Sequence, residues 1–178
     1  MQQAPQAPSL FAELPDDLDG TWQHGFIVGG MAHHTDPFTV ARAYVNAGDV
    51  LTEHPTDKGE PWEVAYPVLF LYRHAIELYL KAIVQPQQDT HDLSQLTLRF
   101  IDYVTNELGE TVPDWFQQYL REFSAIDPRS TAFRYVDGRA TRPLIESNEA
   151  WVEFAHLREV VGALVAIFER LPQARPAH

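Results

Sequence analysis

The sequence predicts an all-α protein, an up-and-down bundle of about five helices with a short polar β-hairpin or loop before the last helix. Three observations lead to this prediction. Apolar residues recur at spacings of three and four, the period of a helix that buries one face. Capping residues and prolines stand where the periodic stretches begin. The connections between these stretches are short, as they are in helical bundles.

The composition fits one packed domain without disulfides or membrane spans. The chain has 178 residues, 45% of them apolar, and no cysteine. The lack of cysteine excludes disulfides and thiolate metal sites and fits a reducing compartment, so we expect a cytoplasmic protein. Charged residues interrupt every longer apolar stretch, so no segment is expected to span a membrane. The net charge of −12 repels nucleic acid at long range, so contact with phosphate needs a local basic site.

Residues 1–20 are expected to form a flexible arm, and residues 21–178 a single helical domain. The arm is rich in Gln, Ala and Pro and then becomes acidic, with no Lys or Arg. Its acidic residues are Glu13, Asp16, Asp17 and Asp19.

Helix starts are indicated by capping side chains and prolines. Asp36 is followed by Pro37, which suits the first helical position. Asp92 with Gln95 three residues later resembles a capping box. Pro113 stands at a further start, and a loop rich in Pro and Gly covers residues 54–61. The predicted helices run over about 36–50, 62–84, 92–108, 113–123 and 147–171.

The helix over residues 62–84 has the clearest pattern. Its apolar stripe, with helical spacing, comprises Leu69, Tyr72, Ile76, Tyr79, Leu80 and Ile83. On a different face, Arg73, Glu77 and Lys81 are each four residues apart, which predicts an exposed ladder of ion pairs. Pro67 is placed near the first turn, where proline is tolerated, and Pro86 closes the helix.

A change of pattern precedes the last helix. Residues 133–141 could form a short hairpin, because Asp137-Gly138 suits a two-residue turn with positive φ. The last helix is then predicted from Ser147 to Leu171. Its apolar stripe comprises Trp151, Phe154, Leu157, Val161, Leu164, Val165 and Phe168.

Three motifs in this order resemble the HEPN family (higher eukaryote and prokaryote nucleotide-binding domains). They are the stretch 72–82, the His-Asp-Leu helix start at 91–96, and the stretch 127–135, which ends in an Arg-Tyr pair. The resemblance implies a helical bundle that dimerises and acts in prokaryotic stress, toxin–antitoxin or phage-defence systems. Many members are metal-independent endoribonucleases, and others are catalytically silent partners or nucleotide-associated modules.

The chain departs from the nuclease members at their catalytic motif. Those members carry an arginine, four to six intervening residues and a histidine near the last helix. No arginine here has a histidine at that distance, and the nearest pair, Arg170 and His178, has seven residues between. The ribonuclease site of the family is therefore not carried over to this chain.

Arginines gather before the last helix. Arg129, Arg134, Arg139 and Arg142 fall in a stretch with one acidic residue, Asp137. The planar guanidinium suits phosphate or carboxylate, so the stretch is a candidate site for phosphate, an RNA backbone or an acidic partner. A structural alternative is that Arg129 and Arg134 brace the bundle by pairing with Asp127 or Glu77. Arg73, Glu77 and Lys81 complete the predicted binding set.

The candidate catalytic residues are Arg73, His74, His91, Arg134 and His156. Together with Glu77, Lys81 and Asp92, they include the acid, base and cation that phosphodiester chemistry needs. The alternative is a surface ion ladder next to a helix start capped at His91-Asp92. His156 can equally be a residue on the flank of its helix.

Neither a metal nor a cofactor is predicted. The metal-capable side chains of the first third of the chain do not match a zinc spacing and are expected to be loop residues. They are His33, His34, Asp36, His54 and Asp57.

The functional hypothesis is a HEPN-like domain that binds RNA, nucleotide or a cognate protein partner through an arginine-rich site, as a homodimer, without the standard nuclease motif. One alternative is a metal-independent endoribonuclease with a non-standard Arg/His site. Another is a non-catalytic dimeric scaffold that uses its aromatic last helix as the subunit interface.

Overall fold

The computed structural model describes residues 16–17, 36–53, 59–86, 90–127 and 151–171. The helices belong to one compact unit that spans Asp36–His178. Among the described residues 79% are helical and none forms a strand, which confirms the predicted all-α class. The elements are α2 (Pro37–Glu53), α3 (Pro61–Val84), α4 (Leu93–Asp102), the π-helical turn η3 (Tyr103–Glu107), α5 (Asp114–Ile126) and α7 (Phe154–Phe168). The predicted hairpin at 133–141 and most of the predicted arm lie outside the described residues.

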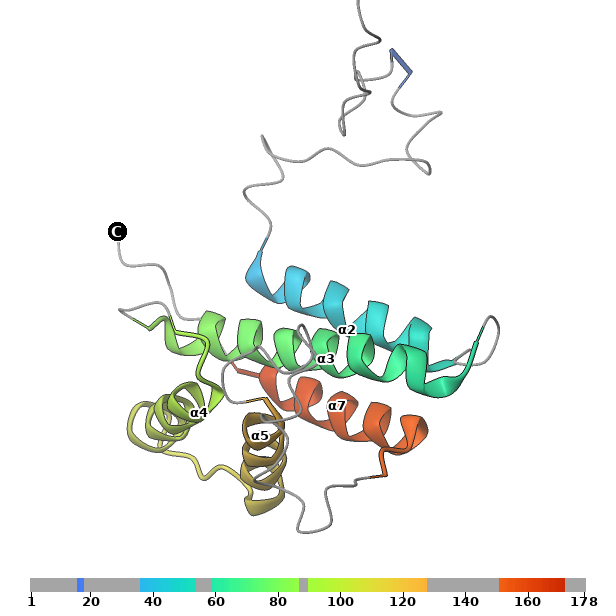
Figure 1. The fold of residues 1–178 in the computed structure, drawn as a ribbon. Coiled ribbons are helices and arrows are strands. Elements are labelled where there is room, and N and C mark those ends of the chain that lie inside the picture. Colours follow the sequence, from blue (N-terminus) through green and yellow to red (C-terminus); the bar gives the residue numbers. More distant parts are fainter. Residues whose placement is uncertain (1–15, 18–35, 54–58, 87–89, 128–150, 172–178) are drawn as a thin grey trace, which may run out of the picture. The chain divides into compact units, whose positions relative to one another are not determined.

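Helix α3 is the centre of the bundle. It contacts α2, α4 and α7, while α2 also contacts α7, and α5 packs on α4 (Figure 1). α2 and α3 run antiparallel, since Phe38 at the start of α2 contacts Tyr79 late in α3, and Asp49 near the end of α2 accepts a hydrogen bond from Tyr72 (2.7 Å). Glu169, just after α7, accepts from the Tyr79 hydroxyl at 2.9 Å. Three helices are thereby joined through α3.

Local sequence explains where most helices begin. The Asp36 carboxylate accepts from the backbone N–H of Thr39 at 3.0 Å and caps α2, which continues to Glu53. The Asp92 carboxylate accepts from Ser94 N at 2.9 Å and Gln95 N at 3.3 Å and caps α4, as predicted. At the start of α3, the Glu63 carboxylate reaches back to the backbone N–H of Glu60 at 2.9 Å.

Three predicted helix details need correction. Pro67 lies beyond the first turn, inside α3, which starts at Pro61 and continues through it to Val84. The third predicted helix is not a continuous α-helix, because its last turn widens into η3, where Leu108 N bonds to Tyr103 O at 3.3 Å. The last helix starts at Phe154, and residues 151–153 before it are not helical.

The core follows the predicted stripe of α3 closely. Tyr72, Ile76, Tyr79, Leu80 and Ile83 are fully buried, whereas Leu69 is only partly buried. At its centre, four aromatic rings from four helices meet with centroid distances of 5.2 to 5.7 Å. They are Tyr79, Phe100, Phe116 and Phe168. Within the described residues, no helix has the length and apolar character needed to cross a membrane.

Candidate functional site

Arg73 and Glu77 form an ion pair inside the protein. The Arg73 Nη1 atom lies 2.9 Å from Glu77 Oε2, and the side chains are 0% and 1% exposed. The prediction that the ladder of Arg73, Glu77 and Lys81 is exposed is therefore wrong for its first two members. Only Lys81 keeps partial access to solvent, with 20% of its side chain exposed.

The burial of Arg73 results from two chain segments that close over it. Its Nη2 donates to the backbone oxygen of His91 at 2.8 Å, and its Nε donates to the backbone oxygen of Asp127 at 2.9 Å. The buried Asp127 carboxylate lies 3.8 Å from Nε. The residue before the α4 cap and the residue that ends α5 are thus both bound to the same guanidinium. Arg73 holds the two segments against α3.

Glu77 connects the buried pair to the surface. Its Oε1 atom lies 2.7 Å from His91 Nδ1 and 3.1 Å from Lys81 Nζ, while Oε2 accepts from Arg73. Burial raises the pKa of Glu77, but the hydrogen bonds from His91, Lys81 and Arg73 together outweigh it and hold the pKa below 4.5. The carboxylate is therefore ionised at neutral pH.

His91 is the most accessible member of this group. Its side chain is 63% exposed, although Nδ1 is in contact with the buried carboxylate. Because an ionised carboxylate can only accept, Nδ1 is the donor of this contact. An imidazole oriented by a carboxylate can accept or donate a proton at neutral pH. The Lys81 ammonium group places a positive charge next to the same oxygen of Glu77, Oε1.

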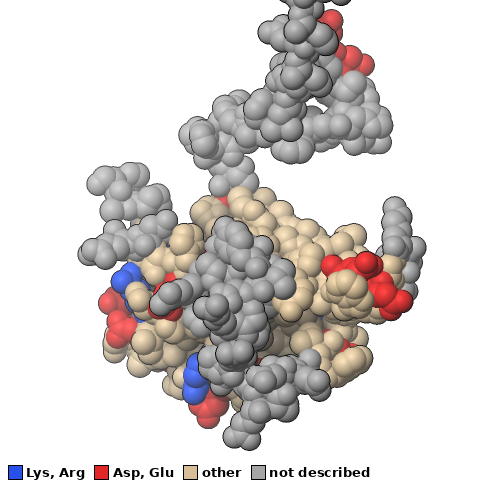
Figure 2. All heavy atoms as spheres, viewed as in Figure 1, with Lys and Arg blue, Asp and Glu red and all other residues tan. Residues whose placement is uncertain are grey.

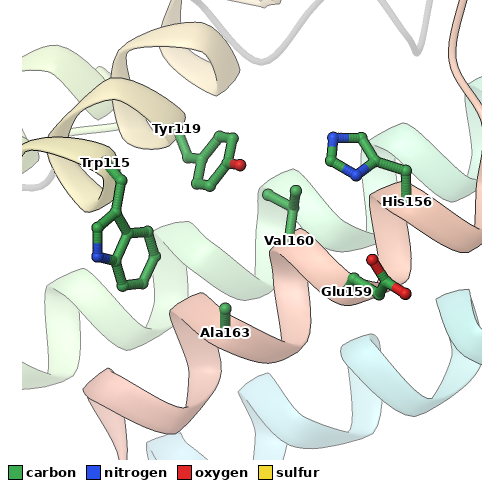
Figure 3. Close-up of a pocket in the computed structure, with 6 residues that line it drawn as sticks. All are labelled: Trp115, Tyr119, His156, Glu159, Val160 and Ala163. Carbon is green, nitrogen blue, oxygen red and sulfur yellow. The ribbon is translucent and has the colours of Figure 1, made fainter.

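The remaining histidine candidates lie in other surroundings. The His74 ring stacks on Phe70 and meets Tyr44 of α2 edge to face, with centroids at 5.8 and 4.6 Å, and burial lowers its pKa below 6.5. His156 is exposed on α7 and lines a shallow hollow with Trp115 of α5 (Figure 3). The structure therefore joins His91 to Arg73 through the backbone oxygen of His91, while the rings of His74 and His156 have different neighbours.

Several predicted residues lie outside the described part of the chain, namely Arg129, Arg134, Arg139 and Arg142 in the arginine-rich stretch and His33, His34, His54 and Asp57 in the metal-capable set. Asp36, the remaining member of that set, caps α2. Among the described residues, no group of three His, Asp or Glu side chains could hold a metal ion.

Sequence reasoning missed the two backbone acceptors of Arg73, because spacing along one helix does not reveal what covers it. One signal was present in the sequence. Arg73 directly follows Tyr72 of the core stripe, and Glu77 directly follows Ile76. The small residue Ala75 lies between Arg73 and Glu77 in the sequence and is fully buried. A helix buried on more than one face is expected at the centre of a bundle.

The chain matches no protein-family model, no curated protein and no solved structure.

Proposed function

We propose that this chain is a HEPN-like domain of a prokaryotic stress, toxin–antitoxin or phage-defence system that binds RNA or a nucleotide. The carrying observation is the double attachment of Arg73. Its guanidinium holds His91 at the surface and also holds Asp127, which precedes Arg129 by two residues in the sequence. The exposed histidine and a residue two positions before the arginine-rich stretch are thereby bound to one buried guanidinium.

The charges assign different roles to the members of this proposed site. Arg73 and Lys81 contribute +2 and Glu77 and Asp127 contribute −2, so the buried group and Lys81 are neutral together. Attraction for phosphate therefore comes from the stretch that contains Arg129, Arg134, Arg139 and Arg142. In this proposal His91 and Lys81 contact the ligand at short range, while Arg73 and Glu77 only position them.

The test is binding of short single-stranded RNA and of nucleoside triphosphates at several salt concentrations. Arg134→Ala is expected to weaken binding and to reduce the slope of log K against log salt by about one phosphate contact. Arg99→Ala, which removes an exposed arginine from α4, is the matched control and should leave binding unchanged. A protein that binds neither RNA nor nucleotides at any of these salt concentrations would refute the proposal.

A second candidate function is metal-independent cleavage of RNA. The 2.7 Å contact between Glu77 Oε1 and His91 Nδ1 favours it, because a carboxylate-held imidazole is a general base or acid. In a chelator, His91→Ala and Arg134→Ala should then both lower the cleavage rate, by about 10²-fold or more for the loss of an acid–base group. Equal residual activity in the wild type and both variants would exclude this function.

We also propose that the chain is a homodimer, which connects it to the scaffold alternative. Trp151, directly before α7, is 91% exposed, so it is not a core residue, contrary to its place in the predicted stripe. Large exposed aromatic residues are frequent anchors of interfaces. Trp151→Ala should therefore lower the mass measured by sedimentation and leave the helical circular-dichroism signal unchanged. An unchanged mass would remove Trp151 from the interface.

A further inference from the structure

Two large aromatic side chains are exposed at the beginning of α3. Trp62 is 68% and Tyr66 is 44% exposed, and they lie one helical turn apart on the same side of the helix. Phe70 and His74 continue the same four-residue spacing and are partly buried. Exposure is therefore greatest at the first two members of this aromatic row.

The packing of the row explains why its exposure changes along the helix. His74 contacts Tyr44 of α2 and stacks on Phe70 with an interplanar angle of 3°. The core side of α3 carries different residues, beginning with the fully buried Val68 and Tyr72. Trp62 and Tyr66 are thus not needed to fill the core, and exposing an indole and a phenol ring one turn apart has a cost in apolar hydration.

Acidic residues flank the start of α3, close to Trp62 and Tyr66 in the sequence. Glu60 and Glu63 at the start of α3 and Glu53 at the end of α2 are exposed. Figure 2 shows a group of acidic atoms at the end of the helical unit where α2 stops and α3 begins. Within the described residues 49–53 and 59–66 there is no lysine or arginine. An Arg158 nitrogen from α7 lies 3.5 Å from Glu53. Glu60 and Glu63 are exposed and belong to the capping box at the start of α3.

We propose that Trp62, Tyr66, Glu60 and Glu63 form a docking surface for a basic segment of a protein partner. An arginine or lysine of that segment would lie over the Trp62 ring and next to the two carboxylates, since cation–π attraction and ion pairing then act on the same group. An apolar neighbour of the basic residue would pack against Tyr66. This surface is separate from the Arg73 site, and the proposal does not depend on RNA binding.

Charge selects this occupant over the alternatives. RNA would bring phosphates next to Glu60 and Glu63, which repel them. A second copy of the chain related by two-fold symmetry would bring the same acidic side chains face to face, in a protein with a net charge of −12. The acidic stretch 13–19 of the chain itself is disfavoured for the same reason.

The test uses the full chain and two labelled synthetic peptides of equal length. One is an amphipathic helix with arginines flanking leucines, and the other has glutamate in place of every arginine. Fluorescence anisotropy should show binding of the arginine peptide alone. The double variant Trp62→Ala/Tyr66→Ala should weaken that binding at least tenfold, and Glu63→Gln, which retains a side chain able to cap the helix, should weaken it less.

Leu98→Ala is the matched control, because Leu98 on α4 is also 68% exposed and lies outside this surface. It should bind the arginine peptide like the wild type, and circular dichroism should show all variants folded. Equal binding by the wild type and the double variant would overturn the proposal. So would a change in sedimentation mass caused by the double variant, because the surface would then be covered by a second copy.

Discussion

The guanidinium of Arg73 and the carboxylate of Glu77, one turn apart on α3, form a 2.9 Å ion pair from which solvent is excluded. A pair at this spacing on a helix surface contributes only about 0.3–0.5 kcal/mol. Here the two charges are instead buried, and each is further satisfied by other chain segments. Removing one partner would break the closest contact between opposite charges in a medium of low polarity and leave the other charge with weaker compensation.

Glu77→Gln is therefore expected to lower the free energy of unfolding by about 3–5 kcal/mol. The variant keeps the shape of the side chain and removes its charge, which leaves the buried Arg73 with only the more distant Asp127 carboxylate, 3.8 Å from Nε, as a counter-charge. Urea unfolding followed by circular dichroism measures the change. Lys81→Gln is the control, since Lys81 binds the same carboxylate from a partly exposed position and should cost about 1 kcal/mol or less. Similar losses in the two variants would contradict the buried pair.

The same carboxylate predicts how stability depends on pH. The pKa of Glu77 in the folded protein lies below its ordinary value of 4.5, because the three hydrogen-bond donors outweigh burial. Its stabilising contribution is complete above pH 4.5 and is lost as the pH falls through the lower, folded-state pKa. The difference in unfolding free energy between wild type and Glu77→Gln should therefore shrink in acid.

Protonation of other groups should largely cancel in this comparison. Burial lowers the pKa of His74 below 6.5, so the fold also loses stability as His74 becomes protonated, but this occurs in both proteins. The difference in unfolding free energy between the wild type and Glu77→Gln could instead stay constant from neutral pH to well below 4.5. That result would show that the Glu77 carboxylate is not held ionised.

Replacing either of two helical glycines by alanine should change the stability of the protein, in opposite directions. A Cβ atom at Gly48 of α2 would lie 2.5 Å from Cε1 of Tyr72, so Gly48→Ala must displace a buried ring and should cost about 1–3 kcal/mol. A Cβ at Gly162 of α7 has no atom within 4 Å, so Gly162→Ala should stabilise the protein by about 0.5–1 kcal/mol. Thermal unfolding of both variants tests the close approach of α2 to α3. Stabilisation by both substitutions would contradict it.

Asp92 provides a test of helix capping next to the candidate site. Its carboxylate accepts from two backbone N–H groups of α4 and from the side chains of Ser94 and Gln95. Asp92→Ala should cost about 0.5–2 kcal/mol, whereas Asp92→Asn retains an accepting oxygen and should cost less. Chemical denaturation of the two variants distinguishes these outcomes. If Asp92→Ala and Asp92→Asn were equally stable, the accepting oxygen at this helix start would contribute nothing to the free energy of unfolding.

Local patterns were sufficient for much of the fold. The spacing of Tyr72, Ile76 and Tyr79 identified the buried stripe of α3, and Asp36 and Asp92 identified two helix starts. These features depend on neighbours within one or two turns, so the sequence contains the necessary information. The predicted start of the last helix was wrong, because apolar spacing also placed Trp151 on the stripe of that helix, although residues 151–153 are not helical and Trp151 is 91% exposed.

The sequence by itself determined that this is a helical bundle built around α3, and which side of α3 carries the apolar core. Only the tertiary structure decided that Arg73 and Glu77 are inside it. Their environment depends on the backbone oxygens of His91 and Asp127, which are 18 and 54 residues from Arg73 along the chain. Helical periodicity separates a polar side from an apolar one, but whether that polar side meets water or other segments depends on how distant parts of the chain pack.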